Sequence, residues 1–286
     1  MTTDPPASDT DASAVADAAD TAAADEQRDV VVVGGGAAGL SAALFTARYD
    51  LDTLVFDRGP SAIRQAYVVE NYLGLPAITP EELLSVGRTQ VEDAGGSVVE
   101  DAVTDVVPLA AGDDAPRFRV ETADGRAVET GAVVAASAYD ADYLPEDVDP
   151  TAVDEGGRTD RDGLYVAGWL TEGPHQVVAC AGQGARVGKT VVSNRRRADG
   201  WWDAVATYYD WSVPEGRYDE AEWHESMDAW LADTRPEAVS DERFERVSEA
   251  VKADRLAFET TATERDERVA SGREALREGL DWPSEG

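Results

Sequence analysis

The sequence predicts an α/β domain with a parallel sheet and a small antiparallel β-meander, followed by an all-helical C-terminal module. Three observations predict this class. A β-branched run at 29–33 is followed by a glycine turn and a run of small residues with helical character. Short β runs separated by turn signals fill 98–136. Beyond residue 194 the composition changes to a strongly charged helical pattern that holds most of the tryptophans.

The first predicted element is a buried strand at 29–33, which leads through three glycines into a helix over 37–49 and a second strand at 53–57. This is a Rossmann-like βαβ unit. Residues 1–28 are rich in Ala, Asp and Thr and contain neither a basic nor an apolar targeting region. We expect them to form a disordered acidic arm.

A helix is predicted from Thr79, the N-cap, and Pro80, the first helical residue, to the glycines at 95–96. The dipeptide Asp124-Gly125 predicts a tight turn within the meander. Two further buried strands are expected, and one helix closes the domain. Their ranges are 132–136, 164–168 and 176–194. The predicted domains are therefore 29–194 and 195–286.

The charge of the chain limits its partners. With 58 acidic and 25 basic residues the net charge is −33, which excludes nucleic acid and anionic membrane surfaces. Lys189 and Lys252 are the only lysines, so nearly all positive charge is arginine. We interpret the dispersed acidity as adaptation to molar salt, a halophilic type, because screening there removes self-repulsion between surface charges. An acidic docking surface is the less favoured interpretation.

Cysteine and histidine are too few for several kinds of site. Cys180 is the only cysteine, which excludes an intramolecular disulfide, a Cys-x-x-Cys pair and a cysteine-based zinc site. With two histidines, no metal site is expected. These features suit a cytoplasmic protein. No membrane span is expected either, because the uncharged stretch at 30–47 is interrupted by glycines.

The strongest functional signal is the turn Gly34-Gly-Gly-Ala-Ala-Gly39, a G-x-G-x-x-G set between a predicted strand and helix. Gly34 permits the tight turn, Gly36 allows a pyrophosphate to approach the backbone, and Gly39 allows close packing of helix on strand. Asp57, at the end of the second strand, would accept a hydrogen bond from a ribose hydroxyl. The motif predicts a dinucleotide site but does not separate FAD from NAD.

Four later segments resemble the low-molecular-weight thioredoxin reductases. Residues 69–76 (VENYLGLP) resemble that family's "VENY-G-P" segment, and 162–168 (DGLYVAG) resemble the strand that closes its flavin domain. Residues 175–177 and 181–184 resemble its Arg-Gln-Ala and Ala-Gly-x-Gly segments. The resemblance covers 29–194 in the family's order. It implies that the cofactor is FAD.

The resemblance assigns residues to parts of FAD. Those expected to hold its pyrophosphate are Gly34, Gly36, Ala37, Ala38 and Gly39. Those expected at its adenosine side are Asp57 and Arg58. Those expected near its ribityl chain and ring are Asn71, Gly168, Trp169, Gln176 and Val177.

The chain also departs from this family. The family's NADPH domain would lie between residues 136 and 164, where only a short polar stretch stands, and the family's dithiol reaction needs two cysteines. Its Ala-Gly-Asp segment, whose acid binds the ribityl chain, ends here in Trp169, which cannot accept a hydroxyl. Its Ala-Thr-Gly segment ends in Ser137.

Two side chains are candidate catalytic groups. His175 could supply a proton or positive charge to a flavin, although a solvated loop residue is the simpler interpretation. Cys180, near a helix start, could be a thiol of lowered pKa, although a small buried residue is more usual there. Gly188-Lys189-Thr190 looks like the end of a P-loop, but the preceding segment is needed as helix.

The sequence therefore predicts an FAD-dependent oxidoreductase. Its electrons would come from a partner protein or from NAD(P)H that docks without a dedicated domain. The alternative is a non-catalytic, degenerate FAD- or nucleotide-binding module with a structural or sensing role. A protein electron donor or acceptor and a homodimer are both compatible with the sequence.

Overall fold

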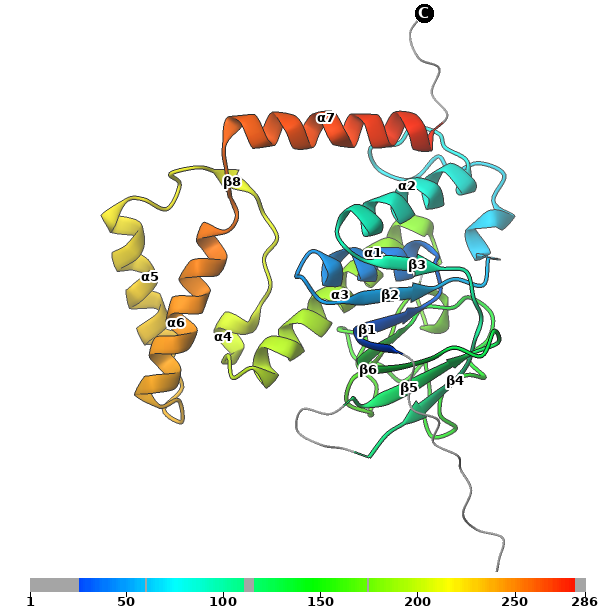
Figure 1. The fold of residues 1–286 in the computed structure, drawn as a ribbon, viewed down its shortest axis with the longest axis horizontal. Coiled ribbons are helices and arrows are strands. Elements are labelled where there is room, and N and C mark those ends of the chain that lie inside the picture. Colours follow the sequence, from blue (N-terminus) through cyan, green and yellow to red (C-terminus); the bar gives the residue numbers. More distant parts are fainter. Residues whose placement is uncertain (1–25, 60, 111–115, 174, 281–286) are drawn as a thin grey trace, which may run out of the picture.

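A branched, mainly parallel sheet forms the centre of the N-terminal domain in the computed structural model, which describes residues 26–59, 61–110, 116–173 and 175–280. The strand order is β3-β2-β1-β6-β5-β4 (Figure 1). In addition, β7 pairs with β6. The strands are β1 (Glu26–Val33), β2 (Thr53–Phe56), β3 (Ser97–Val99), β4 (Val103–Pro108), β5 (Phe118–Thr122), β6 (Ala127–Ala135) and β7 (Leu164–Val166). Pairing is parallel from β3 through β2, β1 and β6 to β7, which confirms the predicted α/β class.

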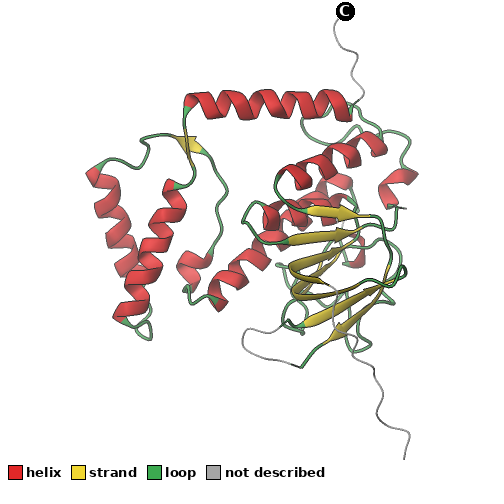
Figure 2. Ribbon diagram, in the orientation of Figure 1, coloured by secondary structure: helices red, strands yellow, loops and turns green. Residues whose placement is uncertain are grey.

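Helices cover one face of the sheet and build the C-terminal module (Figure 2). The α-helices are α1 (Ala37–Ala47), α2 (Pro80–Asp93), α3 (Val177–Ala198), α4 (Asp203–Ala206), α5 (Ala221–Thr234), α6 (Asp241–Leu256) and α7 (Ala262–Gly279). Short 3-10 turns are η1 (Ala62–Gln65) and η2 (Gly168–Leu170). The module is not entirely helical, because β8 (Val213–Pro214) and β9 (Glu259–Thr260) form a short parallel pair. This pair joins the segments before α5 and after α6.

The alternating side chains of β1 reach two different cores. Val30 and Val32 pack with α1 and α3 on one face of the sheet. Val31 and Val33 pack on the other face with Tyr143 and its neighbours. Both sets are buried, as a strand with two covered faces requires. The polar segment 137–163 thus has a structural task, because its apolar residues cover the second face.

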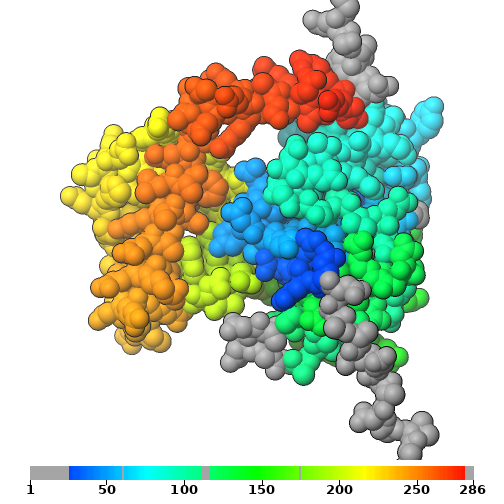
Figure 3. Space-filling view, viewed as in Figure 1, coloured from blue at the N-terminus to red at the C-terminus, as the bar shows by residue number. Residues whose placement is uncertain are grey.

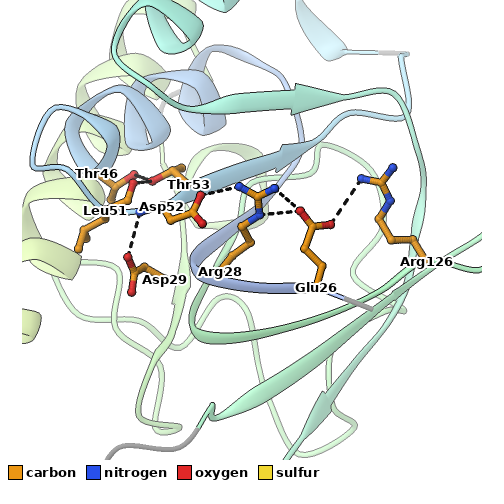
Figure 4. A network of polar contacts seen from close by, with 8 residues as sticks. All are labelled: Glu26, Arg28, Asp29, Thr46, Leu51, Asp52, Thr53 and Arg126. Carbon is orange, nitrogen blue, oxygen red and sulfur yellow. Dashed lines mark hydrogen bonds and ion pairs between the residues drawn. The ribbon is translucent and has the colours of Figure 1, made fainter. Parts of the chain in front are cut away.

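The strand β1 begins at Glu26, three residues earlier than predicted. The extra residues pair in parallel fashion with the first half of β6, where Glu26 lies opposite Val128. The Arg28 guanidinium also donates to the Glu26 carboxylate and, over 2.5 Å, to Asp52 Oδ1 (Figure 4). These pairs tie the start of the strand to the chain that enters β2. The rest of the predicted arm, residues 1–25, lies outside the described residues.

The predicted meander is joined to the parallel sheet through β6. The first half of β6 pairs with β5 in antiparallel fashion, and its last three residues pair with β7 in parallel fashion. The strand predicted at 132–136 is therefore the second half of a longer one. The expected turn at Gly125, with φ of 83°, joins β5 to β6, and Thr79 is the N-cap of α2 as predicted. The structure adds a capping box between Thr79 and Glu82.

Glycines bring α3 into backbone contact with α1. A Cβ atom at Gly184 would lie 2.0 Å from the carbonyl oxygen of Ala38, and one at Gly188 would lie 2.6 Å from that of Ala42. These distances leave no room for a side chain. In contrast, Gly182 has nothing within 4 Å of its Cβ position. The helix ends at Ala198, four residues beyond its predicted end.

Arg196 anchors the C-terminal module to the sheet domain. The residue is 3% exposed, and its guanidinium lies 4.5 Å from the ring centroid of Trp201 and 4.7 Å from that of Tyr49. It also pairs with Asp254 of α6. The last helix of the module, α7, contacts the sheet domain a second time, because its end at Gly279 packs on α2. Figure 3 shows the module beside the sheet domain, with α7 reaching across to it.

We expect Gly184→Ala to lower the free energy of unfolding by about 1–3 kcal/mol, because the added methyl forces α3 away from Ala38. Gly182→Ala is the matched control on the same helix, and its higher helix propensity should raise stability by up to about 1 kcal/mol. Denaturant titration of both variants measures the difference. Equal effects at the two positions would contradict the packing role of Gly184.

We expect Arg196→Met to cost about 2–4 kcal/mol, because it leaves Asp254 without its cation and removes three aromatic contacts. The neighbouring Arg195→Met is the control, because Arg195 is exposed and its pairs with Asp29 and Asp199 are long, at 3.6 and 3.4 Å. Its cost should stay below about 1 kcal/mol. Equal losses in denaturant titration would show that Arg196 does not anchor the module.

Candidate functional site

A cavity of about 450 Å³ lies at the carboxyl ends of β1, β6 and β7. The chain leaves β1 toward β2 on one side and leaves β6 toward β7 on the other, so the sheet reverses its order between them. Such a reversal opens a crevice in which α/β proteins hold ligands. The two strand ends are adjacent, since a Cβ atom at Gly34 would lie 2.6 Å from the Ala136 oxygen. The cavity is therefore where the fold class places a ligand.

Most of the predicted site residues meet in this cavity. Those that line it are Gly36, Ala37, Ala38, Asn71, Gly168, Trp169, His175, Gln176, Val177 and Cys180. A second hollow of about 50 Å³ shares Gly36 and Ser61 with it, and is lined by the predicted residues Gly34, Asp57 and Arg58. Gly39 lines neither hollow. A Cβ atom there would lie 1.8 Å from the Gly34 oxygen, so Gly39 serves the close contact of α1 with the turn.

Two helices direct their positive ends at the cavity. The N-caps are Gly36 for α1 and Gln176 for α3, and both residues line it. Neither N-cap side chain accepts a hydrogen bond from the first turn of its own helix, and neither first turn contains an acid. The first-turn N–H groups thus remain available to a ligand. Together the two helix ends provide a site for an anionic group.

Space and backbone conformation at the cavity fit FAD. At Gly36 a Cβ atom would lie 3.0 Å from the Ser61 hydroxyl, so the glycine keeps the gap between α1 and Ser61 open. Gly168 has φ of 76°, which favours glycine, and its N–H donates to Gln183 Oε1 over 2.9 Å. Gln183 in turn donates to Thr171 Oγ1 over 2.7 Å. This pair of bonds holds the η2 turn against α3.

Trp169 forms an aromatic group at the cavity wall. Its ring lies 5.6 Å from that of Tyr139, in a perpendicular arrangement, and 5.0 Å from the ring of His175. His175 is exposed but packs against Trp169, so it is more than a solvated loop residue. Nearby, Asn71 donates to Gln176 Oε1 over 2.8 Å and joins the 69–76 segment to the start of α3.

Asp57 already has protein partners. Its buried carboxylate pairs with Arg88 of α2 and accepts the N–H of Gly59 over 3.0 Å. A Cβ atom at Gly35 would lie 2.5 Å from Asp57 Cγ, so the glycine turn rests directly on this side chain. Arg58 lines the same small hollow and pairs with Asp140 at 2.7 Å. The acid therefore also supports the turn, a role that the spacing alone did not indicate.

Cys180 lines the cavity from α3, where burial raises the pKa of its thiol. This direction is opposite to the one that a thiolate nucleophile needs at neutral pH. Sequence reasoning did not assign the polar lining residues Ser61 and Glu70 to the site, and it named Ser137 only as a departure from the family's Ala-Thr-Gly segment. Ser61 and Ser137 come shortly after predicted strands, and that position is the signal by which they could have been found.

Comparisons with known proteins support this site. The family described as "FAD binding domain" matches residues 29–68, which hold the glycine turn and Asp57. This match confirms the predicted cofactor, FAD. No curated protein matches the chain.

Solved structures share the fold. A thioredoxin reductase from Gloeobacter violaceus has a TM-score of 0.57 and 16% identity, covering 65% of this chain and 98% of its own. The atypical thioredoxin reductase from Desulfovibrio vulgaris Hildenborough has a TM-score of 0.52 and 19% identity, covering 61% of this chain and 100% of its own. The thioredoxin reductase from Giardia duodenalis has a TM-score of 0.52 and 14% identity, covering 62% of this chain and 100% of its own. At these identities the likeness establishes the fold.

The described ranges contain neither a candidate membrane-spanning helix nor a candidate metal site. No helix there has the length and hydrophobicity that crossing a bilayer requires. No cluster of His, Cys, Asp and Glu side chains there could hold a metal ion.

We expect Cys180 to be alkylated slowly at neutral pH, with a rate that keeps rising above the ordinary thiol pKa of about 8.5. The sign follows from burial, which disfavours the thiolate. FAD should slow the reaction further, because the thiol lines the cavity. The measurement is the iodoacetamide rate against pH, with the urea-unfolded chain as control. A folded protein that titrates below the unfolded one would contradict the assignment.

Proposed function

We propose that this protein is an FAD-dependent oxidoreductase that resembles thioredoxin reductases but lacks their NADPH domain and redox dithiol. The observation that supports it best is the convergence of two helix N-termini on a cavity at the carboxyl ends of three parallel strands. The residues proposed to contact FAD are Gly34, Gly36, Ala37, Ala38, Asp57, Arg58, Asn71, Gly168, Trp169, Gln176 and Val177.

Each part of the site is proposed to contact a different part of FAD. FAD, when bound, supplies hydride and electron transfer. The N–H groups at the start of α1 neutralise its phosphates, as glycine turns do in this class of fold. The N-terminus of α3 stabilises negative charge at the ring, and Gln176 is oriented there by Asn71. Trp169 provides an apolar wall where the family has an acid, so we assign the ribityl hydroxyls to the polar lining side chains Glu70 and Ser61.

The electron donor in this proposal is a partner protein or a directly docked NAD(P)H. Two features support it. The chain has one cysteine, so no dithiol can carry electrons. Moreover, the segment 137–163 between β6 and β7, where the family has its NADPH domain, packs on the second face of the sheet. Its contacts there are made by Tyr143, Leu144 and Val148. We place the protein in the cytoplasm of a cell adapted to high salt. A homodimer is compatible with this proposal.

A second candidate function is a non-catalytic FAD- or nucleotide-binding module. Trp169 supports it, because it stands where a ribityl-binding acid is expected and packs between two aromatic rings. The Ser137 hydroxyl supports it too, because it is already bonded to Tyr143 and to the Asp140 oxygen. Such a protein would hold the nucleotide without exchanging electrons.

The visible spectrum of the protein purified in high salt tests the proposal. We expect stoichiometric flavin bands that bleach on anaerobic addition of NADH or NADPH. Bleaching by dithionite alone would instead support a partner protein as donor. Bands that resist every reductant would favour the non-catalytic module, and a colourless protein that FAD cannot reconstitute would overturn the proposal.

A pair of glycine variants tests the position of the site. Gly36→Leu should reduce FAD occupancy at least about tenfold, because its side chain projects toward Ser61 in the cavity. Gly182→Ala, with open space around it, should keep full occupancy. The ratio of flavin to protein absorbance measures both, and circular dichroism verifies folding. Full occupancy in Gly36→Leu would place the flavin elsewhere.

A further inference from the structure

A basic groove runs along the outer face of α3, away from α1. It has a volume of about 400 Å³ and is lined by Arg158, Gly182, Ala185, Arg186, Lys189, Thr190, Ser193 and Arg197. The positions on α3 recur every three or four residues, so they form one face of the helix. Among these lining residues none is acidic, although acids outnumber bases by 58 to 25 in the chain. We propose that this groove binds the phosphate groups of a small phosphorylated ligand, specifically a nucleotide.

Two cations of the groove have no anionic partner. Arg186 makes no ion pair with any described residue. Lys189 also makes none among them, and its ammonium lies 6.0 Å from the ring centroid of Tyr209. Most other arginines of the chain pair with a carboxylate, as Arg195 does with Asp199. Free cations side by side in so acidic a chain indicate an anion supplied from outside.

The other two cations are held close together by one amide. Arg158 donates to Asn194 Oδ1 over 3.1 Å, and Arg197 donates to the same oxygen over 2.9 Å. Asn194 is itself fixed by its bond to the Tyr165 hydroxyl, at 2.8 Å. Each guanidinium also pairs with a carboxylate, Arg158 with Asp154 and Arg197 with Asp203, and its remaining N–H groups can donate to a ligand in the groove. Guanidinium forks suit phosphate oxygens, and Ser193 and Thr190 add hydroxyls to the same wall.

The dimensions of the groove favour a small ligand over a protein. Its volume falls within the range of small-molecule sites, roughly 300–1,000 Å³. Arg186 and Arg197 are eleven residues apart on the helix, or roughly 16 Å, which suits a ligand with phosphates and an organic part. Asp154 and Asp203, which pair with Arg158 and Arg197, flank the groove and would repel a large acidic surface. A nucleotide that enters the groove avoids most of that repulsion.

This inference does not depend on flavin chemistry. Gly188, Lys189 and Thr190 lie in the middle of α3, where the backbone N–H groups are used by the helix, so a P-loop is not the binding mode. Side chains carry the site instead. None of the groove residues lines the FAD cavity.

The two lysines allow a direct test in the FAD-loaded full chain. Acetylation by an amine-reactive ester is followed at Lys189 and Lys252 by peptide mass spectrometry, with pyrophosphate, ADP and NADPH as probes at one fixed high salt concentration. Each effective probe should slow Lys189 at least about threefold and leave Lys252 unchanged, because Lys252 is paired with Asp228 in the module. Protection by pyrophosphate or ADP identifies a general phosphate site. NADH, which lacks the 2′-phosphate of NADPH, serves as a further probe. Protection of Lys189 by NADPH but not by NADH would show that the groove binds the 2′-phosphate.

Charge variants complete the test. Arg186→Gln should weaken ADP or NADPH protection of Lys189 at least about tenfold. Arg273→Gln on α7 removes the same charge far along the chain and should change nothing. Neither variant should alter the flavin spectrum, so a failure here is distinct from a failure of the proposed function. The proposal is overturned if no probe protects Lys189, if sulfate protects it equally, or if only poly-glutamate does.

Discussion

The backbone contact between α1 and α3 is the constraint on which the rest of the structure depends. Gly184 and Gly188 let α3 lie directly on Ala38 and Ala42, so both helices begin at the same edge of the sheet. Their N-termini therefore face one cavity. The same helix continues to Arg196, which holds the C-terminal module. A side chain at either glycine would separate the helix ends and change the cavity and the module together.

The helix α3 carries several positively charged groups in a chain whose net charge is −33. At one end the helix offers unpaired N–H groups to the cavity, and along its outer face it carries the groove cations. Net charge acts over long distances and is screened to roughly 3 Å in molar salt. Contacts within hydrogen-bond distance are little affected by that screening. Local geometry, and not total charge, therefore decides which anions this protein can hold.

Sequence patterns succeeded wherever the cause lies within a few residues. The βαβ unit, the Thr79 N-cap and the turn at Gly125 all depend on neighbours along the chain, and all were predicted. Predictions failed at element ends. The strand β1 starts early because its first residues pair with the first half of β6, which is distant in sequence, and β6 is longer than expected because it joins two partners on one edge.

By itself the sequence determined the glycine turn and its βαβ context, because periodicity and turn chemistry are local properties of a chain. FAD as the cofactor followed from the resemblance of later segments to a known family, and the family match confirms it. Only the tertiary structure decided that Asp57 also pairs with Arg88, that Trp169 lies between Tyr139 and His175, and that four cations share one groove. These are contacts between residues distant in sequence. They depend on how closely α3 approaches α1 and the sheet, which no local pattern specifies.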